Sequence, residues 1–384
     1  MKNGWVMEKL GVLTTKIGSG ATPLGGEAAY KQTGISLIRS MNVHDDGFRK
    51  FGLARLDNEQ AERLSNVEVE PNDVLLNITG ASVARCCLVP RDVLPARVNQ
   101  HVSIIRPTKE GIDSAFLRYL LISKDYKERL LSTGEGGGST RQAITKAQLQ
   151  EFTIRYPKPI SEQQRIVGIL DKAFEGIATA KANAEKNLQN ARALFESHLQ
   201  SVFFQHGPGW VVKPISECFK VRSGDFLPAK AMVEIGNVDV YGGNGVNGRH
   251  NQHNLSGRNI IIGRVGAKCG NVRGVEGNVW VTDNAFYISE YCQEFDLGFL
   301  AQLLDRKQLR RTANQAAQPV ISYTTIKDVV LEFPTDISAQ KKISDALSTL
   351  EAETQRLASI YQRKLAALEA LKKSLLHQAF TDKL

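Results

Sequence analysis

Apolar residues recur every three or four positions along two long stretches of the chain, one after Ser161 and one after Ser338. Neither stretch has an internal proline, and the first contains only two glycines, Gly168 and Gly176. Steps that average near 3.5 residues keep an apolar seam on one face of a helix. We therefore predict two long helices with Ser161 and Ser338 as their N-caps.

A lone helix of ~40 residues is a rod of roughly 60 Å that exposes its seam to water. Two helices of equal length can bury each other's seams, so we predict an antiparallel coiled coil rather than ordinary core packing. The predicted seam positions are Ile166, Leu170, Ile177, Leu188 and Phe195 in the first helix, and Ile343, Leu347, Leu350, Leu357, Leu368 and Leu375 in the second.

The remaining sequence predicts two globular units of mostly β structure. Short apolar runs bounded by Gly, Asn, Asp and Pro are typical of strands, and a few stretches have helical periodicity instead. This mixture is an α+β pattern and not an alternating βαβ one. The predicted strands are Val74–Ile78, Val102–Ile105, Asn259–Ile262 and Val279–Val281, and the predicted helical stretches are Ser114–Leu131 and Leu297–Leu309.

The chain repeats itself at a constant offset of 177 positions, because Ile144 corresponds to Ile321 and Gln163 to Gln340. A weaker repeat relates Asp73–Ala81 to Asn259–Ala267. A tandem duplication is the simplest explanation, so we predict a pseudo-two-fold internal repeat. The predicted parts are globular domains at residues 1–158 and 207–335 and helical regions at residues 159–206 and 336–384.

Charge and cysteine content narrow the functional classes. The chain has 384 residues, with 49 Lys and Arg against 40 Asp and Glu, a net charge of +9 that fits a polyanionic partner. Its five scattered cysteines form no Cys-x-x-Cys pair, as expected of reduced thiols in the cytoplasm. No secretory signal or membrane-spanning run is evident, so we expect a cytoplasmic protein.

Two similar units on a rigid helical rod could read two stretches of duplex DNA. Along a DNA duplex, the same groove faces the same side once per turn, roughly every 34–36 Å. Because the two units have diverged, we expect them to read different half-sites and the complete target to be asymmetric. The length of the rod would then set the number of unread base pairs.

These features together resemble the specificity subunits of type I restriction–modification systems, over essentially the whole chain. The boundary signature occurs twice, as Ile144–Ile166 (I-T-K-A-Q-L ending in P-K-P-I-S-E-Q-Q-R-I) and Ile321–Ile343 (I-S-Y-T-T-I ending in P-T-D-I-S-A-Q-K-K-I). The second unit also carries Tyr241–Gly245 (Y-G-G-N-G), Ile260–Gly266 (I-I-I-G-R-V-G) and Val281–Ala285 (V-T-D-N-A), typical of the family's target-recognition domains. The first unit departs from this pattern and has Ile35–Asn42 and Asn77–Ala81 in related places.

The resemblance implies partners and an activity that belongs to them. Such subunits bind two adenine-N6 methyltransferase subunits, which carry S-adenosylmethionine, on helices that correspond here to Ser161–Phe203 and Ser338–Phe380. Motor–nuclease subunits, which use ATP and Mg, join through that complex. The chain itself lacks a Gly-x-x-x-x-Gly-Lys-Ser/Thr segment and an Asn-Pro-Pro-Tyr motif, so we expect a non-catalytic recognition subunit.

Polar residues near Gly-rich turns are the candidate DNA contacts, because Arg pairs with guanine, Asn pairs with adenine, and small residues let the backbone approach phosphates. For each of them the alternative is an ordinary solvated or turn residue. We expect Asp283 to orient its neighbours rather than contact DNA. The candidates are Lys16, Ser19, Arg39, Asn42, Thr79, Arg97, Gln100, Ser139, Thr140 and Arg141 in the first unit, and Arg222, Ser223, Tyr241, Asn244, Arg249, Arg264, Lys268, Thr282 and Asn284 in the second.

Three other motifs resemble functional sites, but their surroundings in the sequence do not support that interpretation. Gly243-x-Gly245-x-x-Gly248 matches a dinucleotide fingerprint, but the residues after it predict a strand rather than the required helix. His250-x-x-His253 has no further metal ligands at suitable spacing, and Cys86-Cys87 is best explained by buried packing. The remaining alternative function is a non-catalytic coiled-coil scaffold whose globular units bind protein.

Overall fold

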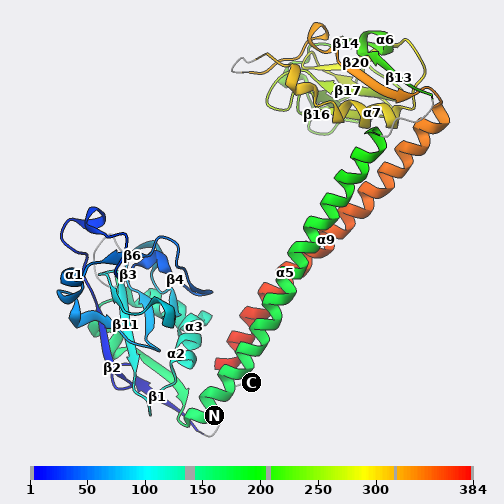
Figure 1. The fold of residues 1–384 in the computed structure, drawn as a ribbon. Helices are drawn as coiled ribbons and strands as arrows, with labels where there is room; N and C mark the ends of the chain where they lie inside the picture. Colours follow the sequence, from blue (N-terminus) through cyan, green and yellow to red (C-terminus); the bar gives the residue numbers. More distant parts are fainter. Residues whose placement is uncertain (1–3, 135–142, 205–208, 315–317, 382–384) are drawn as a thin grey trace. The chain divides into compact units, whose positions relative to one another are not determined.

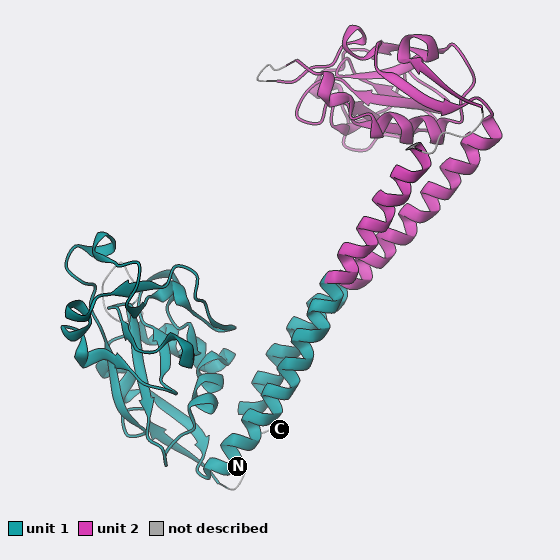
Figure 2. Ribbon diagram, in the orientation of Figure 1, with its two compact units in different colours: residues 1–185, 362–384 teal, residues 186–361 magenta. Residues whose placement is uncertain are grey.

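The computed structural model describes residues 4–134, 143–204, 209–314 and 318–381, which form two compact units (Figures 1 and 2). Unit 1 comprises residues 1–185 and 362–384, and unit 2 comprises residues 186–361. Each unit contains one globular head and a part of each long helix. We call the described residues of 4–157 head 1 and those of 209–334 head 2.

Head 1 is built from two four-stranded sheets and a two-stranded ribbon. The ribbon pairs β1 (Trp5–Lys9) with β12 (Thr153–Pro157). The first sheet has the order β2 (Thr14–Ser19), β11 (Val102–Pro107), β8 (Val74–Asn77), β9 (Cys86–Leu88). The second has the order β6 (Ala54–Leu56), β3 (Ile35–Ile38), β10 (Ala96–Val98), β7 (Glu68–Val69), in which β3 and β10 are parallel.

The first sheet of head 1 is covered on both faces, because its side chains alternate between two cores. On β8, Val74 and Leu76 belong to the core that also contains Phe116 and the long helices, whereas Leu75 packs with Ile38 and the second sheet. A strand buried on both faces has a continuous apolar run. This explains why the Val74–Ile78 run predicts the strand correctly.

Head 2 repeats this topology without a counterpart of β7, and the predicted α+β internal repeat is confirmed. Its ribbon pairs β13 (Trp210–Pro214) with β21 (Val330–Pro334). Its first sheet has the order β14 (Phe219–Ser223), β20 (Ala285–Tyr291), β17 (Asn259–Gly263), β18 (Val272–Val275). Its second has the order β16 (Gly245–His250), β15 (Val238–Gly242), β19 (Val279–Val281), and again the β15–β19 pair is parallel.

The short helices largely follow the predicted ones, with one break. The stretch from Ser114 forms two helices, α2 (Ser114–Ile122) and α3 (Lys124–Gly134), because Ser123 is extended and its hydroxyl donates to the Leu120 carbonyl. Its counterpart in head 2 is α7 (Leu297–Arg306). The smaller helices are α1 (Asn58–Glu62), α4 (Lys146–Glu151), α6 (Ile215–Cys218) and α8 (Tyr323–Ile326), and a two-stranded hairpin joins β4 (Val43–His44) to β5 (Gly47–Phe48).

The two long helices are α5 (Ile160–Phe204) and α9 (Ile337–Phe380), of 45 and 44 residues. In unit 1 the last residues of α9 share a core with the first turns of α5, since Phe380 packs with Ile166. In unit 2 the pairing is reversed, since Leu347 near the start of α9 shares a core with Phe203 at the end of α5. The helices are therefore antiparallel, and every predicted seam residue is buried or half-buried.

The predicted N-caps of the long helices are wrong. Both helices begin two residues earlier than these caps imply, at Ile160 and Ile337, so Ser161 and Ser338 lie inside the first turn. The Pro159 carbonyl accepts from the Glu162 amide at 3.1 Å, which places Ser161 within the helical hydrogen-bond pattern. At the start of α9, the Asp336 carboxylate accepts from the Ser338 amide at 3.0 Å.

A buried glutamine joins each head to the first turn of its long helix. In unit 1 the Gln163 amide oxygen accepts from the Asp113 backbone N–H at 2.7 Å, and its nitrogen donates to the Pro157 carbonyl at 2.9 Å. In unit 2 Gln340 makes the same two bonds, with Asp296 at 2.9 Å and Pro334 at 2.8 Å. Asp113 and Asp296 are themselves the N-caps of α2 and α7. The repeat therefore conserves a hydrogen-bonded joint as well as a sequence.

The cysteines are unpaired and differ in exposure. Burial raises the pKa of Cys87 to about 12 and that of Cys218 to about 11, so these thiols hold their protons at pH 8. Cys292 is exposed. We predict that iodoacetamide at pH 8 modifies Cys292 first in the native chain, because the thiolate is the reactive form and needs access. Peptide mass spectrometry would check this, and simultaneous labelling of Cys87 would contradict it.

Candidate nucleic-acid interface

The ends of five strands converge at one place in head 2. The turn at residues 282–284 lies between β19 and β20, and it is bonded to the ends of three other strands. The Thr282 N–H donates to the Tyr241 carbonyl at 2.8 Å, and the Arg264 N–H donates to the Asn284 carbonyl at 2.9 Å. The Gly224 N–H donates to the Ala285 carbonyl at 3.1 Å. Side chains from the ends of β14, β15 and β17 are thereby gathered around this turn.

Glycines make this convergence sterically feasible. A Cβ on Gly224 would overlap the Val281 carbonyl oxygen, and one on Gly243 would overlap that of Val265. A Cβ on Gly263 would overlap the carbonyl oxygen of Gly243 itself. Because backbones this close leave no room for any side chain, the glycines of Y-G-G-N-G and I-I-I-G have a packing reason to be there.

Arg264 holds the converging strands together. Its Nη1 donates to the Ser223 hydroxyl at 3.2 Å and to the Asp283 carbonyl at 3.3 Å, and its guanidinium lies over the Phe286 ring. The Asp283 carboxylate in turn accepts from the Asn284 amide at 3.4 Å, in keeping with its expected orienting role. Asn284 and Asn244 are exposed beside this framework. Their amides carry the donor and acceptor pair that matches adenine in the major groove.

Head 1 has the same convergence with different side chains. The Asn99 N–H donates to the Ile38 carbonyl at 3.1 Å, and the Ile78 N–H donates to the His101 carbonyl at 3.0 Å. Gly20, like Gly224, has no room for a Cβ, here because of the Val98 carbonyl. The hydrogen bonds align Val98–Val102 (V-N-Q-H-V) with Val281–Ala285 (V-T-D-N-A). His101 is therefore the counterpart of Asn284.

His101 was missed by the sequence reasoning, which selected only its neighbour Gln100. His101 Nδ1 is bonded to the Thr79 hydroxyl at 2.5 Å, and its Nε2 lies 3.1 Å from the Gln100 amide nitrogen. The Gln100 oxygen accepts from the Thr22 hydroxyl at 2.5 Å. This chain of polar groups brings together two predicted residues, Thr79 and Gln100. The five-residue alignment could have identified His101, but its segments share only their first residue type.

Three predicted contact residues are buried, and we reassign them to internal roles. Asn42 accepts from the Arg39 N–H at 3.0 Å and donates to the Arg49 carbonyl at 2.8 Å. The Arg97 guanidinium donates to the Ala61 carbonyl at 3.1 Å. In head 2, the side chain of Thr282 is buried, and the residue is only 3% exposed. A buried side chain cannot reach a base edge without unfolding its surroundings, so these three predictions are corrected.

Other predicted residues lie outside the convergence or are paired with acidic groups. Arg39 pairs with Glu27 at 2.6 Å, and Arg249 lies 3.6 Å from Asp239. Lys16 lies opposite Arg106 on β2, where burial and then the like charge of Arg106 lower the pKa of Lys16. Arg222 is exposed on β14.

The remaining predicted residues include three that cannot be placed. Ser19 ends β2, Ser223 ends β14, half-buried Tyr241 lies on β15, and exposed Lys268 follows β17. Ser139, Thr140 and Arg141 lie outside the described residues. The contact role of every exposed residue remains a prediction.

The rejected dinucleotide motif lies in a β-hairpin, as its sequence predicts. Gly243 and the residues after it connect β15 to β16, and Gly248 pairs with Val240 across the two strands. No helix follows, so the motif lacks the strand-to-helix turn that binds a pyrophosphate. Within the described ranges, no group of three or more His, Cys, Asp or Glu side chains could hold a metal ion, and no helix is long and apolar enough to cross a bilayer.

Duplicated heads with matching polar turns, joined to paired long helices, define a class of tandem-repeat recognition proteins. A family model for the type I restriction modification DNA specificity domain matches residues 5–189 and 208–362, which is most of the chain. The chain belongs to this family.

Individual relatives agree with this assignment. The EcoprrI type I restriction enzyme specificity subunit of Escherichia coli is 26% identical over 156 residues, which are 40% of this chain and 38% of that relative. The HsdS subunit of Thermoanaerobacter tengcongensis has a similar fold, with a TM-score of 0.68, 18% identity and coverage of 100% of this chain and 98% of that one. A chain from a study of complex assembly in the type I R-M system has a TM-score of 0.73, 17% identity and coverage of 100% and 99%.

Proposed function

We propose that each head reads one half of an asymmetric, bipartite duplex DNA target. The observation that carries this proposal is the same convergence of strand ends in both heads, lined by different polar side chains. The backbone framework is shared, but His101 in head 1 corresponds to Asn284 in head 2. An imidazole and an amide offer different hydrogen-bonding patterns to base edges, so the two halves of the target should differ. The net charge of +9 favours the phosphate backbone as a partner.

In this proposal the chemistry belongs to partner subunits in the cytoplasm. Two adenine-N6 methyltransferase subunits, which supply S-adenosylmethionine, would dock on the exposed faces of α5 and α9. Motor–nuclease subunits using ATP and Mg would join through them. The residues of this chain position the duplex, and the methyltransferase would extrude the target adenine from the stack, at a cost of a few kcal/mol. This division of labour makes the chain a non-catalytic recognition subunit.

The test is to map methylated adenines after DNA is exposed to the complex with the cognate methyltransferase. We predict that Asn284→Ala relaxes one base position in one half-site, because a lost bidentate contact removes about 1–3 kcal/mol of discrimination. His101→Ala should relax the other half-site instead. Gln150→Ala, an exposed residue of α4 beside Gly11 and therefore at the opposite end of β2 from the convergence, is the control and should change neither.

Salt dependence separates this proposal from its alternative. A DNA reader loses affinity steeply as salt rises, since bound cations are released from the phosphates when it binds. A complex with no DNA affinity, or with affinity that salt does not change, would overturn the proposal in favour of a scaffold whose heads bind protein.

A further inference from the structure

A basic hollow of about 660 Å³ lies in head 2 beside the converging strand ends. It is formed by the loop after β17 and by the 3-10 turn η8 (Leu309–Thr312). Three of its lining side chains are cations, and one is a carboxylate. The polar residues that line it are Lys268, Arg310, Arg311, Asn271, Gln308 and Asp305. The excess of positive charge favours an anion as the occupant.

The backbone segments that carry the cations of the hollow are held together by direct contacts. Gly270 has a φ of +84°, and a Cβ on it would overlap the Arg310 backbone nitrogen, so loop and turn are in direct backbone contact. The Arg310 guanidinium donates to the Ala267 carbonyl. Beneath them, Cys269 and Leu309 are buried in the core of head 2. A frame fixed before binding avoids the entropy cost of ordering a flexible loop.

The same loop forms one side of the predicted base-reading site. It begins at Arg264, whose N–H donates to the Asn284 carbonyl at 2.9 Å. Further along, a Cβ placed on Gly266 would lie 3.8 Å from the amide oxygen of Asn244, so the loop passes close to that side chain. The loop then returns to Gly263, where the Gly270 N–H donates to the Gly263 carbonyl at 2.6 Å. One short loop therefore contacts the segments that carry Asn284 and Asn244 near its start, and it carries Lys268 near its end.

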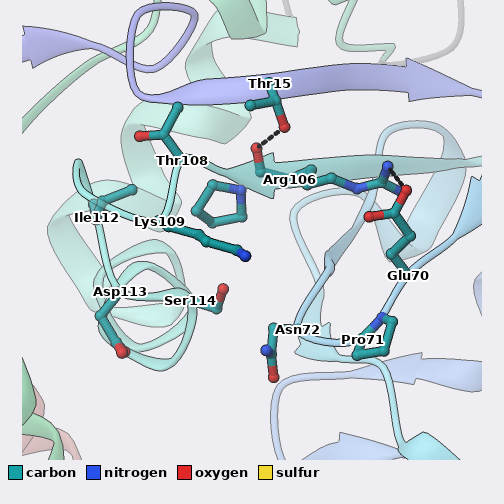
Figure 3. Close-up of a pocket in the computed structure, with 11 residues that line it drawn as sticks. Thr15, Glu70, Pro71, Asn72, Arg106, Thr108, Lys109, Ile112, Asp113 and Ser114 are labelled. Carbon is teal, nitrogen blue, oxygen red and sulfur yellow. Dashed lines mark hydrogen bonds and ion pairs between the residues drawn. The ribbon is translucent and has the colours of Figure 1, made fainter.

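The charge of this hollow contrasts with that of a hollow in head 1, of about 480 Å³, at the end of β11 (Figure 3). There Arg106 is paired with Glu70, as Figure 3 shows, and also with Asp73, at 2.8 Å. Lys109 points into the same space, which Asp113 also lines. Carboxylates balance those cations, so the head 1 hollow offers no comparable site for an anion.

We propose that the hollow formed by Lys268, Arg310 and Arg311 binds a backbone phosphodiester of the DNA half-site that head 2 reads. This rests on the proposed function. Even with Asp305 ionised, the three cations leave two positive charges for a group that carries one negative charge. Phosphate contacts fix the register of a protein on a duplex without reading its sequence. The hollow would thus hold the duplex in position while Asn244 and Asn284 read its bases.

The test uses the complex with the cognate methyltransferase, and the variants Lys268→Gln, Arg310→Gln and Arg311→Gln. Affinity is measured against salt for a cognate duplex and for one whose second half-site is scrambled. The three substitutions combined should reduce the slope of log K against log salt by about 1, because one phosphodiester loses its cations, and each alone should remove a part of that. The loss of affinity between 50 and 200 mM salt should then be about fourfold smaller in the combined variant, on both duplexes alike. The positions of methylated adenines should not change.

Two controls separate charge from structure. Arg310→Lys keeps the charge and should keep the slope. Arg258→Gln removes an exposed cation that precedes β17 at the strand's opposite end, and it should leave the slope unchanged. Unchanged slopes in all three Gln variants would overturn the assignment of the hollow as a phosphate site, while leaving the proposed function intact. An effect confined to the cognate duplex would also overturn that assignment, because it would show that these residues read bases. No salt-dependent affinity in the wild-type complex would instead be a failure of the proposed function.

Free anions could use the same chemistry, so inorganic phosphate and ATP are titrated into the complex without DNA at physiological salt. We expect no saturable binding below millimolar concentration, because the duplex supplies the neighbouring contacts that a free anion lacks. Tight binding of either probe that Arg311→Gln abolishes would identify a free-anion site and overturn the DNA assignment.

Discussion

Gly224→Ala is expected to weaken recognition of the half-site that head 2 reads while leaving the other half-site intact. The new Cβ would overlap the Val281 carbonyl oxygen and lie 2.8 Å from that of Thr282. Two backbones must then separate, and overpacking of this kind costs about 1–3 kcal/mol. Separation moves the turn that carries Asn284, so we expect the affinity for duplexes carrying only this half-site to fall about 5- to 150-fold. Competition binding and methylated-adenine mapping would measure it.

The repeat supplies matched controls for this substitution. In the Gly20→Ala variant of head 1, the new Cβ would overlap the Val98 carbonyl oxygen, so this variant should impair the other half-site only. Gly18→Ala on β2 and Gly274→Ala on β18 meet no atom within 4 Å and should leave recognition unchanged. Loss of both half-sites in the Gly224 variant would contradict independent reading by the two heads. Unaltered binding would show that the strand convergence does not position the contacts.

The elements of this fold could be predicted from sequence where the pattern is local. A seam that repeats through about eight or nine turns defines a helix whatever it packs against, and a continuous apolar run such as Val74–Ile78 defines a buried strand. The break at Ser123 could not be predicted in this way, because apolar periodicity continues across it. The helix starts were predicted two residues late, because a serine is a common cap but here Asp336 provides the bond at α9.

The candidate site was harder to predict, because hydrogen bonds between distant residues decide which polar side chains are free. Asn42 and Arg97 look like surface residues in the sequence, but each satisfies backbone groups inside head 1. His101 became a candidate only when backbone bonds aligned it with Asn284. Composition and motif can identify a polar turn, but the exposure of each side chain depends on tertiary partners that lie far away in the chain.

The strongest effect on stability is expected at the buried glutamine joint. Gln163→Leu removes the partner of the Asp113 N–H and of the Pro157 carbonyl, and both groups are left without a hydrogen bond in an enclosed place. Each buried group that loses its partner costs about 1–3 kcal/mol, so we expect a loss of about 2–6 kcal/mol in the free energy of unfolding of unit 1. Urea unfolding of the full chain would measure this, and hydrogen exchange should accelerate first at the start of α2.

The neighbouring residue offers a control of identical chemistry, since Gln164→Leu alters an exposed side chain one position along the same helix and should change stability little. In unit 2, Gln340→Leu should accelerate exchange at the start of α7 instead, because the same bonds join Asp296 and Pro334 there. If Gln163→Leu proved as stable as Gln164→Leu, the duplicated glutamine would not be what joins each head to its helix. Acceleration at α2 and α7 together in a single variant would show that the two units unfold as one.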